Sequence, residues 1–138
     1  IRLSLVGSEM CIRDRTGPLL GAASSALLNA LKKLAGIDQE VDLVSAAAIE
    51  PIQTLKTNYL GSKNPRLHTD EILIALSSSA ATNPTAALAL RQLSALKGCD
   101  MHSTVILSSV DTDTVKKLGM YLTCEPAYEE EDRKYHKK

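Results

Sequence analysis

Residues 101–124, "MHSTVILSSVDTDTVKKLGMYLTC", contain the pattern that decides the fold class. Their first third holds the run "VIL", and a short, continuously apolar, β-branched run is typical of a buried strand. The middle third predicts a short helix capped by Asp111 and stopped by Gly119. The last third is a second short strand, closed by Pro126. A strand, a helix and a second strand in this order form a βαβ crossover, so we expect two parallel strands.

Residues 17–37, "GPLLGAASSALLNALKKLAGI", predict a long helix because leucines recur at steps of three and four. Lys32 and Lys33 suit its C-terminus, and Gly36 is placed to stop it. Residues 21–30 are mostly small, which favours close packing of this helix against another backbone. Close approach of a ligand is the alternative use of the same small residues.

Two shorter segments follow this helix. "EVDLVS" at 40–45 alternates apolar and polar residues and predicts a short strand. "AAAIEPIQTLKTNYLG" at 46–61 predicts a helix in which Pro51 occupies the first turn or marks a break.

Two more helices precede the βαβ pattern. "EILIALSSSAA" at 71–81 is apolar on most faces, which indicates a buried helix, and Thr69 is placed to cap it. "TNPTAALALRQLSALKG" at 82–98 predicts another, with Asn83 as cap and Pro84 at the first helical position.

These elements together predict a helix-rich layered α/β domain. Its sheet is expected to be small and mostly parallel, with about three strands near 41–45, 102–108 and 120–124 and about five covering helices.

The composition excludes several classes of function. The 16 basic residues balance the 16 acidic ones, so the chain lacks the positive charge that nucleic acid or a membrane surface attracts. Trp and Phe are absent, which argues against base stacking, and no apolar run approaches a membrane span. Three cysteines are too few for a disulfide scaffold. We therefore expect a cytoplasmic protein without a nucleic-acid or membrane partner.

Residues 1–15 differ from the rest of the chain, because they show no sustained period and no signal-peptide core. "LVGSEMCIRDR" at 5–15 resembles the translation of an adapter used to prepare DNA sequencing libraries. We interpret 1–15 as an adapter-derived, disordered segment, and the chain as a fragment whose true N-terminal part is missing. A genuine N-terminal arm is the alternative. Residues 16–126 then form one domain, and 127–138 form a charged tail.

The loop "SKNPRLHTDE" at 62–71 holds the strongest candidate binding site. Lys63, Asn64, Arg66 and His68 precede a predicted helix start, and such side chains beside free helix N–H groups suit an anion such as phosphate or carboxylate. The acidic residues that follow argue against this site because they already neutralise the helix end. The alternative is an ordinary polar loop with a cap.

Other catalytic or metal-binding patterns are weak. Cys99 and His102 form one Cys-x-x-His pair, which with His68 or Cys124 would approach a zinc site. Structural zinc usually needs two close pairs, and residues three apart on a strand face opposite sides, so we predict no metal. The serines lack a nucleophile elbow, and no phosphate-binding Gly-Lys loop occurs, so the catalytic residues and cofactors stay unknown.

Residues 60–126, "LGSKNPRLHTDEILIALSSSAATNPTAALALRQLSALKGCDMHSTVILSSVDTDTVKKLGMYLTCEP", resemble the C-terminal region of a bacterial family, the domain-of-unknown-function 1846 proteins. "LLNALKKLAGI" and "IEPIQTLKTNYLG" upstream are similar to the same family. The resemblance implies that 16–126 is the C-terminal domain of a longer α/β, nucleotide-binding-like protein whose phosphate-loop-like segment lies upstream. Some members have been labelled ATP-dependent zinc proteases, which no His-Glu-x-x-His motif supports here.

Two hypotheses of function follow. In the first, the chain is a domain of a cytoplasmic enzyme acting on a phosphorylated or nucleotide-like small molecule, and the 62–71 loop contributes anion contacts. In the second, it is a non-catalytic packing or oligomerisation domain. The small-residue helix at 21–30 and the "ILIAL" helix at 72–76 would then bury against the missing N-terminal part or a second copy of the chain.

Overall fold

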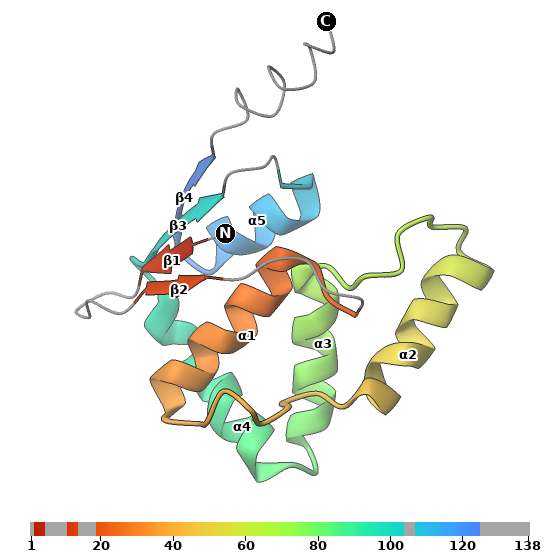
Figure 1. The fold of residues 1–138 in the computed structure, drawn as a ribbon, viewed down its shortest axis with the longest axis horizontal. Helices are drawn as coiled ribbons and strands as arrows, with labels where there is room; N and C mark the ends of the chain where they lie inside the picture. The colour runs from red at the N-terminus through yellow and green to blue at the C-terminus, as the bar shows by residue number, and fades with distance from the viewer. Residues whose placement is uncertain (1, 5–10, 14–18, 104–106, 125–138) are drawn as a thin grey trace, which may run out of the picture.

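A computed structural model describes residues 2–4, 11–13, 19–103 and 107–124. In this part of the chain the helices occupy α1 Ala22–Ala35, α2 Ala46–Thr54, the π-helix η1 Leu55–Tyr59, α3 Thr69–Ala80, α4 Pro84–Leu90, the 3₁₀-helix η2 Arg91–Leu96 and α5 Ser109–Lys117. The strands are β1 Arg2–Ser4, β2 Cys11–Arg13, β3 Asp100–Ser103 and β4 Tyr121–Cys124. Figure 1 shows the sheet and α5 at one end of the molecule, with α1, α3 and α4 side by side beyond them.

The parallel βαβ unit predicted from 101–124 is confirmed, but its first strand is Asp100–Ser103 rather than 102–108, and residues 104–106 lie outside the described residues. β3 pairs in parallel with β4, and Asp100 lies opposite Tyr121 at the start of the ladder. The crossover helix α5 begins earlier than predicted: its N-cap is Ser108, whose Oγ accepts a hydrogen bond from the backbone N–H of Asp111 at 3.2 Å. Asp111 was predicted to be this cap, and it lies instead in the first turn. The helix-rich α/β class is therefore confirmed.

Two further strands extend the sheet. The strand order is β2-β1-β3-β4, and β1 pairs antiparallel with both β2 and β3. These strands lie within residues 1–15, where the sequence predicts no regular structure, since short segments without alternation carry no strand signal. The adapter origin of 1–15 stays a prediction. The predicted tail at 127–138 lies outside the described residues.

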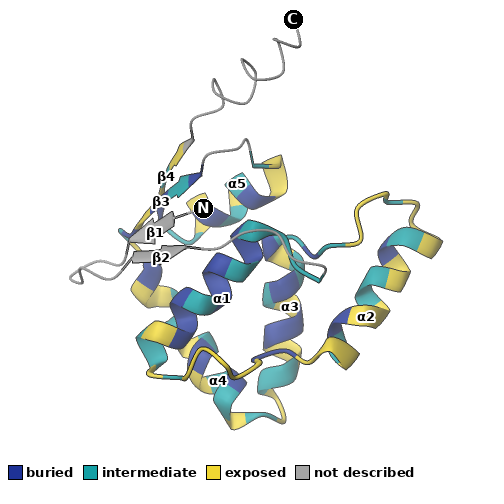
Figure 2. Cartoon of the chain, viewed as in Figure 1, coloured by how far each residue is buried: buried dark blue, intermediate teal, exposed yellow. Residues whose placement is uncertain are grey.

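Helix α1 forms the centre of the core. Gly36 ends it with φ of +72°, as predicted, and its small face is buried through Ala23, Ala26 and Ala30. Figure 2 shows this helix buried along most of its length, and it contacts α3, α4 and η2. The predicted close packing of 21–30 is confirmed, but its partners lie within this chain.

The strand predicted near 41–45 is wrong. These residues form a bent connection without a strand partner, and Val41 is 38% exposed. Leu43 and Val44 are both buried although they are neighbours, which a strand with one buried face does not allow. Leu43 and Val44 belong to the hydrophobic core, which explains the apolar residues that suggested a strand.

Helix α2 contains Pro51 in its interior rather than in its first turn, and it continues into η1 without stopping there. Helix α3 begins at Thr69, so its N-cap is His68 and not Thr69 as predicted. The start of α4 is as predicted, because the Asn83 Oδ1 accepts hydrogen bonds from the backbone N–H groups of the next turn.

The "ILIAL" helix, α3, buries its apolar residues inside this domain. Ile72, Ala75 and Leu76 belong to the core, and α3 packs against α1, α4 and α5. Ile74 is the exception, with 66% of its surface exposed. The domain's own helices cover most of the 21–30 and 72–76 faces, and assembly with a second copy or with the rest of a longer protein stays a prediction.

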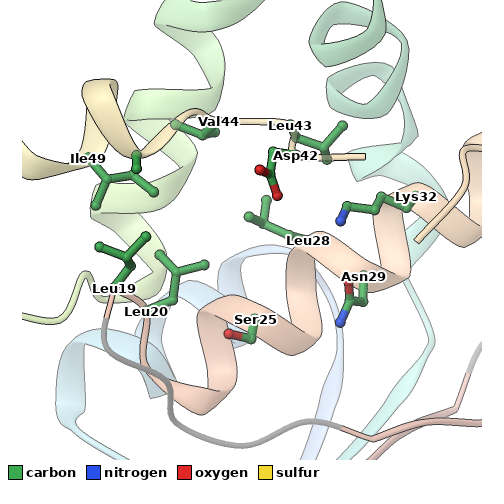
Figure 3. A pocket seen from close by; sticks show the side chains of 11 residues that line it. Leu19, Leu20, Ser25, Leu28, Asn29, Lys32, Asp42, Leu43, Val44 and Ile49 are labelled. Atoms are coloured by element: carbon green, nitrogen blue, oxygen red, sulfur yellow. The ribbon is translucent and has the colours of Figure 1, made fainter. Parts of the chain in front are cut away.

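A pocket of about 210 Å³ lies between α1 and the 42–49 segment, and Figure 3 shows the side chains that line it. Within the described residues, no helix is both long enough and apolar enough to cross a membrane.

Replacement of a core leucine tests this packing. We expect Leu31→Ala to lower the free energy of unfolding by about 2–5 kcal/mol, because Leu31 is fully buried on α1 and leaves a cavity. The matched control is Leu55→Ala on η1, where the side chain is 49% exposed and the expected loss is below about 1 kcal/mol. Urea unfolding followed by circular dichroism measures both, and equal losses would contradict the assignment of α1 to the core.

Candidate functional site

The 62–68 loop is fixed by hydrogen bonds within itself. The Ser62 hydroxyl accepts from the backbone N–H of Asn64 and donates to its carbonyl, both at 3.2 Å. The Asn64 Oδ1 accepts from the backbone N–H of Arg66 at 3.0 Å, as in an Asx turn. Asn64 therefore shapes the loop, and its side-chain oxygen is already engaged.

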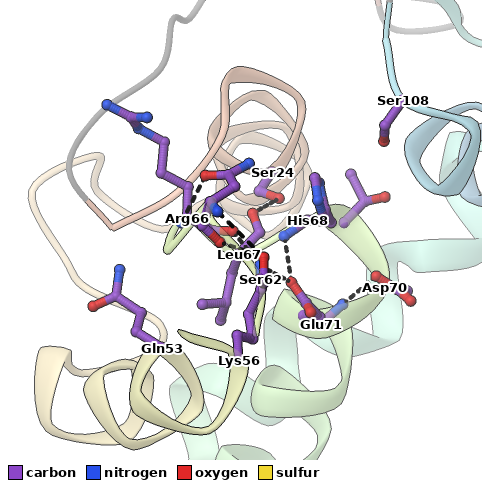
Figure 4. A network of polar contacts seen from close by, with 12 residues as sticks. Ser24, Gln53, Lys56, Ser62, Arg66, Leu67, His68, Asp70, Glu71 and Ser108 are labelled. Atoms are coloured by element: carbon purple, nitrogen blue, oxygen red, sulfur yellow. Dashed lines mark hydrogen bonds and ion pairs between the residues drawn. The ribbon is translucent and has the colours of Figure 1, made fainter. Parts of the chain in front are cut away.

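Lys56 anchors the same loop from beneath. It projects from η1, is only 7% exposed, and its Nζ donates to the Arg66 carbonyl at 2.6 Å and to Glu71 Oε1 at 2.9 Å. The same Glu71 oxygen accepts from the backbone N–H of His68 at 2.8 Å. Figure 4 shows these contacts converging below the loop. A partly buried ion pair, whose lysine also binds a backbone carbonyl, thus joins η1, the loop and α3.

Asp111 links the starts of two helices. Its Oδ1 accepts from the backbone N–H and the hydroxyl of Thr69, at 2.9 and 2.8 Å, and its Oδ2 lies 3.7 Å from His68 Nδ1. Asp111 is 8% exposed and Thr69 is fully buried. A carboxylate from α5 therefore neutralises the positive end of α3.

The structure brings the four predicted anion-binding residues into one loop. Lys63 is exposed, Arg66 and His68 are partly buried, and the Asn64 oxygen is used within the loop. Two backbone donors at the start of α3 are not available to a ligand, because Glu71 and Asp111 accept from them. An anion here could not be held by these two backbone donors, so the loop side chains are the candidates for holding it.

Sequence reasoning missed Lys56 and Asp111. Lys56 lies ten residues before the loop carbonyl that it binds, on a helix whose lysines look solvent-exposed in sequence. Asp111 resembles a cap of its own helix, and nothing in the sequence pairs it with Thr69, 42 positions away. Only the packing of α3 against α5 joins them.

The residues of the weaker metal candidate, Cys99 and His102, each contact a different part of the protein. Cys99 is buried, and its Sγ lies 3.7 Å from the Ala95 carbonyl. His102 Nδ1 lies 2.8 Å from the hydroxyl of Thr123, its cross-strand neighbour. The side chain of Cys124 lies outside the described residues, and among those that are described no three His, Cys, Asp or Glu residues are grouped to hold a metal.

Comparison with known proteins places the chain in a family. The family model for the C-terminal domain of unknown function DUF1846 matches residues 5–134. This chain belongs to the DUF1846 family. The match begins inside the 1–15 segment and covers the loop and all of the helices described above.

Curated relatives of the DUF1846 chain are UPF0371 proteins. That of Corynebacterium aurimucosum is 56% identical over 127 residues, which are 92% of this chain and 26% of the relative. That of Corynebacterium efficiens is 57% identical over 125 residues, 91% of this chain and 25% of the relative. That of Streptococcus sanguinis is 44% identical over 137 residues, 99% of this chain and 27% of the relative. The chain thus spans about a quarter of the length of these relatives, and the function of the family is not established.

Removal of the Asp111 carboxylate tests its role at the two helix starts. We expect Asp111→Ala to lower the free energy of unfolding by about 2 kcal/mol or more, since it leaves the buried N–H and hydroxyl of Thr69 without their charged acceptor. Asp113→Ala on the same helix is the control, because Asp113 is exposed, and its expected effect is within about 0.5 kcal/mol. Urea unfolding compares the two variants, and an equal loss in both would exclude the capping role.

Proposed function

We propose that this chain is the C-terminal domain of a longer cytoplasmic protein, and that its 62–68 loop supplies anion contacts to a site completed by the rest of that protein. The ligand class is a phosphorylated or nucleotide-like small molecule. The length of the relatives supports the view that more chain takes part, because this domain spans about a quarter of them.

One observation carries the proposal. The loop backbone is held on its inner side by Lys56 and by the Asn64 and Ser62 turns, while Lys63 stays exposed. A rigid backbone reduces the entropy lost when cationic side chains close on a ligand. His68 adds a ring whose Nδ1 faces Asp111, and such a carboxylate helps to fix the orientation of an imidazole.

Anion titration of the intact longer protein tests this role. We expect the double variant Lys63→Ala, Arg66→Ala to lower affinity for inorganic phosphate or ATP about ten-fold or more, because charge-assisted hydrogen bonds are lost. Lys117→Ala is the control, since Lys117 is an exposed lysine on α5 and lies outside the loop. Calorimetry measures the affinities, and unchanged binding in the double variant would remove the proposal.

A second candidate function, packing against another part of the protein, is favoured by an apolar ridge. We define the ridge as Leu55, Tyr59 and Leu60, which are 49%, 76% and 72% exposed along η1 and at its C-cap. Large apolar side chains grouped on one exposed helix end often mark an interaction surface. The ridge leads directly into the cationic loop, and ligand sites are common where domains meet. We therefore propose that the remainder of the same polypeptide covers the ridge.

The ridge proposal predicts different effects of the same substitutions on the stability of the intact protein and of this chain. We expect Tyr59→Asp with Leu60→Asp to lower the melting temperature of the intact protein, because charges are placed in the proposed interface. The same change should alter the unfolding free energy of the 138-residue chain by less than about 0.5 kcal/mol. Ile74→Asp is the control, since Ile74 is 66% exposed on α3, outside the ridge.

Calorimetric scans of the intact protein and urea unfolding of the chain provide the two readouts. An unchanged melting temperature of the intact protein in the ridge variant would contradict the ridge as an internal interface. Light scattering of the chain adds a further outcome: self-association that the ridge variant abolishes would make a second copy the occupant instead.

A further inference from the structure

The pocket between α1 and the 42–49 segment is lined by no residue of the 62–68 loop, although Leu19 and Leu20 at its edge pair with Leu67 of that loop. Its volume of about 210 Å³ is below the roughly 300–1,000 Å³ of sites for drug-sized ligands. A molecule bound there must therefore be small. One wall comes from α1, where Ser25, Leu28, Asn29 and Lys32 lie on one helical face.

The two ends of the pocket differ in chemistry. Leu19, Leu20 and Ile49 form one end, which is entirely aliphatic, while Lys32 and Asp42 lie at the other (Figure 3). Buried leucine and valine side chains from the 42–49 segment cover the space between the ends. A ligand that matches this arrangement has an aliphatic group at one end and charges at the other.

Lys32 supplies a cation with unused hydrogen-bonding capacity. The residue is only 7% exposed, and its Nζ donates to the Gln39 carbonyl at 3.0 Å. An ammonium group has three N–H donors, so one carbonyl leaves two for a ligand or water. No ion pair joins Lys32 to a carboxylate in the part of the chain that the structure describes. The lysine is therefore placed to receive an anionic group.

Asp42 supplies the opposite charge. It lines the same end of the pocket and is exposed, and in Figure 3 its carboxylate is directed toward the space that the Lys32 ammonium enters. The two charges form no ion pair with each other among the described contacts. A purely anionic ligand would be opposed by Asp42, and a purely cationic one by Lys32. A ligand carrying both charges uses both residues.

We propose that this pocket binds a free α-amino acid with an aliphatic side chain. The carboxylate contacts Lys32, the ammonium contacts Asp42, and the side chain occupies the end formed by Leu19, Leu20 and Ile49. This assignment accounts for the small volume, the separated ends and the two charges, and it does not depend on the anion site at 62–68.

Three probes separate the contributions of the two charges. L-leucine carries both charges, isovalerate carries the carboxylate and the same aliphatic group, and isoamylamine carries the ammonium and that group. We expect leucine to bind the 138-residue chain. The affinity of each single-charge probe should be lower than that of leucine by about ten-fold or more. Chemical-shift titration of the methyl groups measures the affinities and identifies the site.

Matched variants assign each charge to its residue. Lys32→Met keeps the apolar stem and removes the charge. The affinities of leucine and isovalerate should therefore both fall about ten-fold or more. Lys33→Met is its control, because Lys33 is the exposed neighbour that does not line the pocket. Asp42→Asn should lower the affinity for leucine but not for isovalerate. Glu40→Gln is its control, because Glu40 is exposed and lies outside the pocket, and both affinities should stay unchanged in that variant.

Several results would overturn the proposal. One is no binding of leucine at concentrations up to about 10 mM, and another is equal affinity in Lys32→Met and Lys33→Met. A third is isovalerate binding as tightly as leucine with no effect of Asp42→Asn. Unfolding curves are recorded for each variant. If Lys32→Met is unfolded, leucine binding by Asp42→Asn decides the outcome, because Asp42 is exposed and its replacement leaves the core intact.

Discussion

The close packing of α1 is the constraint on which the rest of the structure depends. Ala26 and Ala30 are fully buried, and the leucines between them enter the common core with α3 and α4. Small side chains on this face let neighbouring helices come close enough for leucine side chains to interdigitate. The opposite face of the same helix is less tightly covered, and the pocket lies there. One helix thus determines both where the core is dense and where a small molecule has room.

A second dependence is electrostatic. Asp111 and Glu71 place negative charge at the start of α3. Asp111 reaches it from α5, and Glu71 pairs with Lys56 of η1. Lys56 and Thr69 complete these contacts from η1 and α3, so the loop at 62–68 is bounded by satisfied hydrogen bonds. This arrangement explains why the loop has a defined shape although its outer residues face solvent. It also means that the backbone N–H groups of His68 and Thr69 are engaged within the domain.

The surface of the domain then carries three distinct features: the apolar ridge at the end of η1, the cationic loop that follows it, and the polarised pocket beside α1. The first two are continuous along the chain, which suits a face where other parts of a longer protein meet a ligand. The pocket has its own charges and its own aliphatic end. A domain of this size can therefore combine a structural role with recognition of a small molecule, without using the same residues for both.

The sequence by itself determined the features that depend on neighbouring residues. The leucine repeat located α1, the apolar segment at 71–81 located α3, Asn83 and Pro84 located the start of α4, and the strand–helix–strand order of 101–124 predicted the parallel β3–β4 pair. These predictions succeeded because capping and amphipathic burial are local in sequence. Local patterns also placed the candidate loop correctly as a connection before α3.

Tertiary structure decided everything that joins distant segments. It turned the apolar 41–45 stretch into a buried connection, added β1 and β2 to the sheet, and paired Asp111 with Thr69 and Lys56 with Glu71. It also buried most of the helical faces at 21–30 and 72–76, while Ile74 and the ridge stay exposed. The physical reason is that burial and charge pairing depend on which surfaces meet in space, and a single sequence records what each side chain prefers but not which partner it finds.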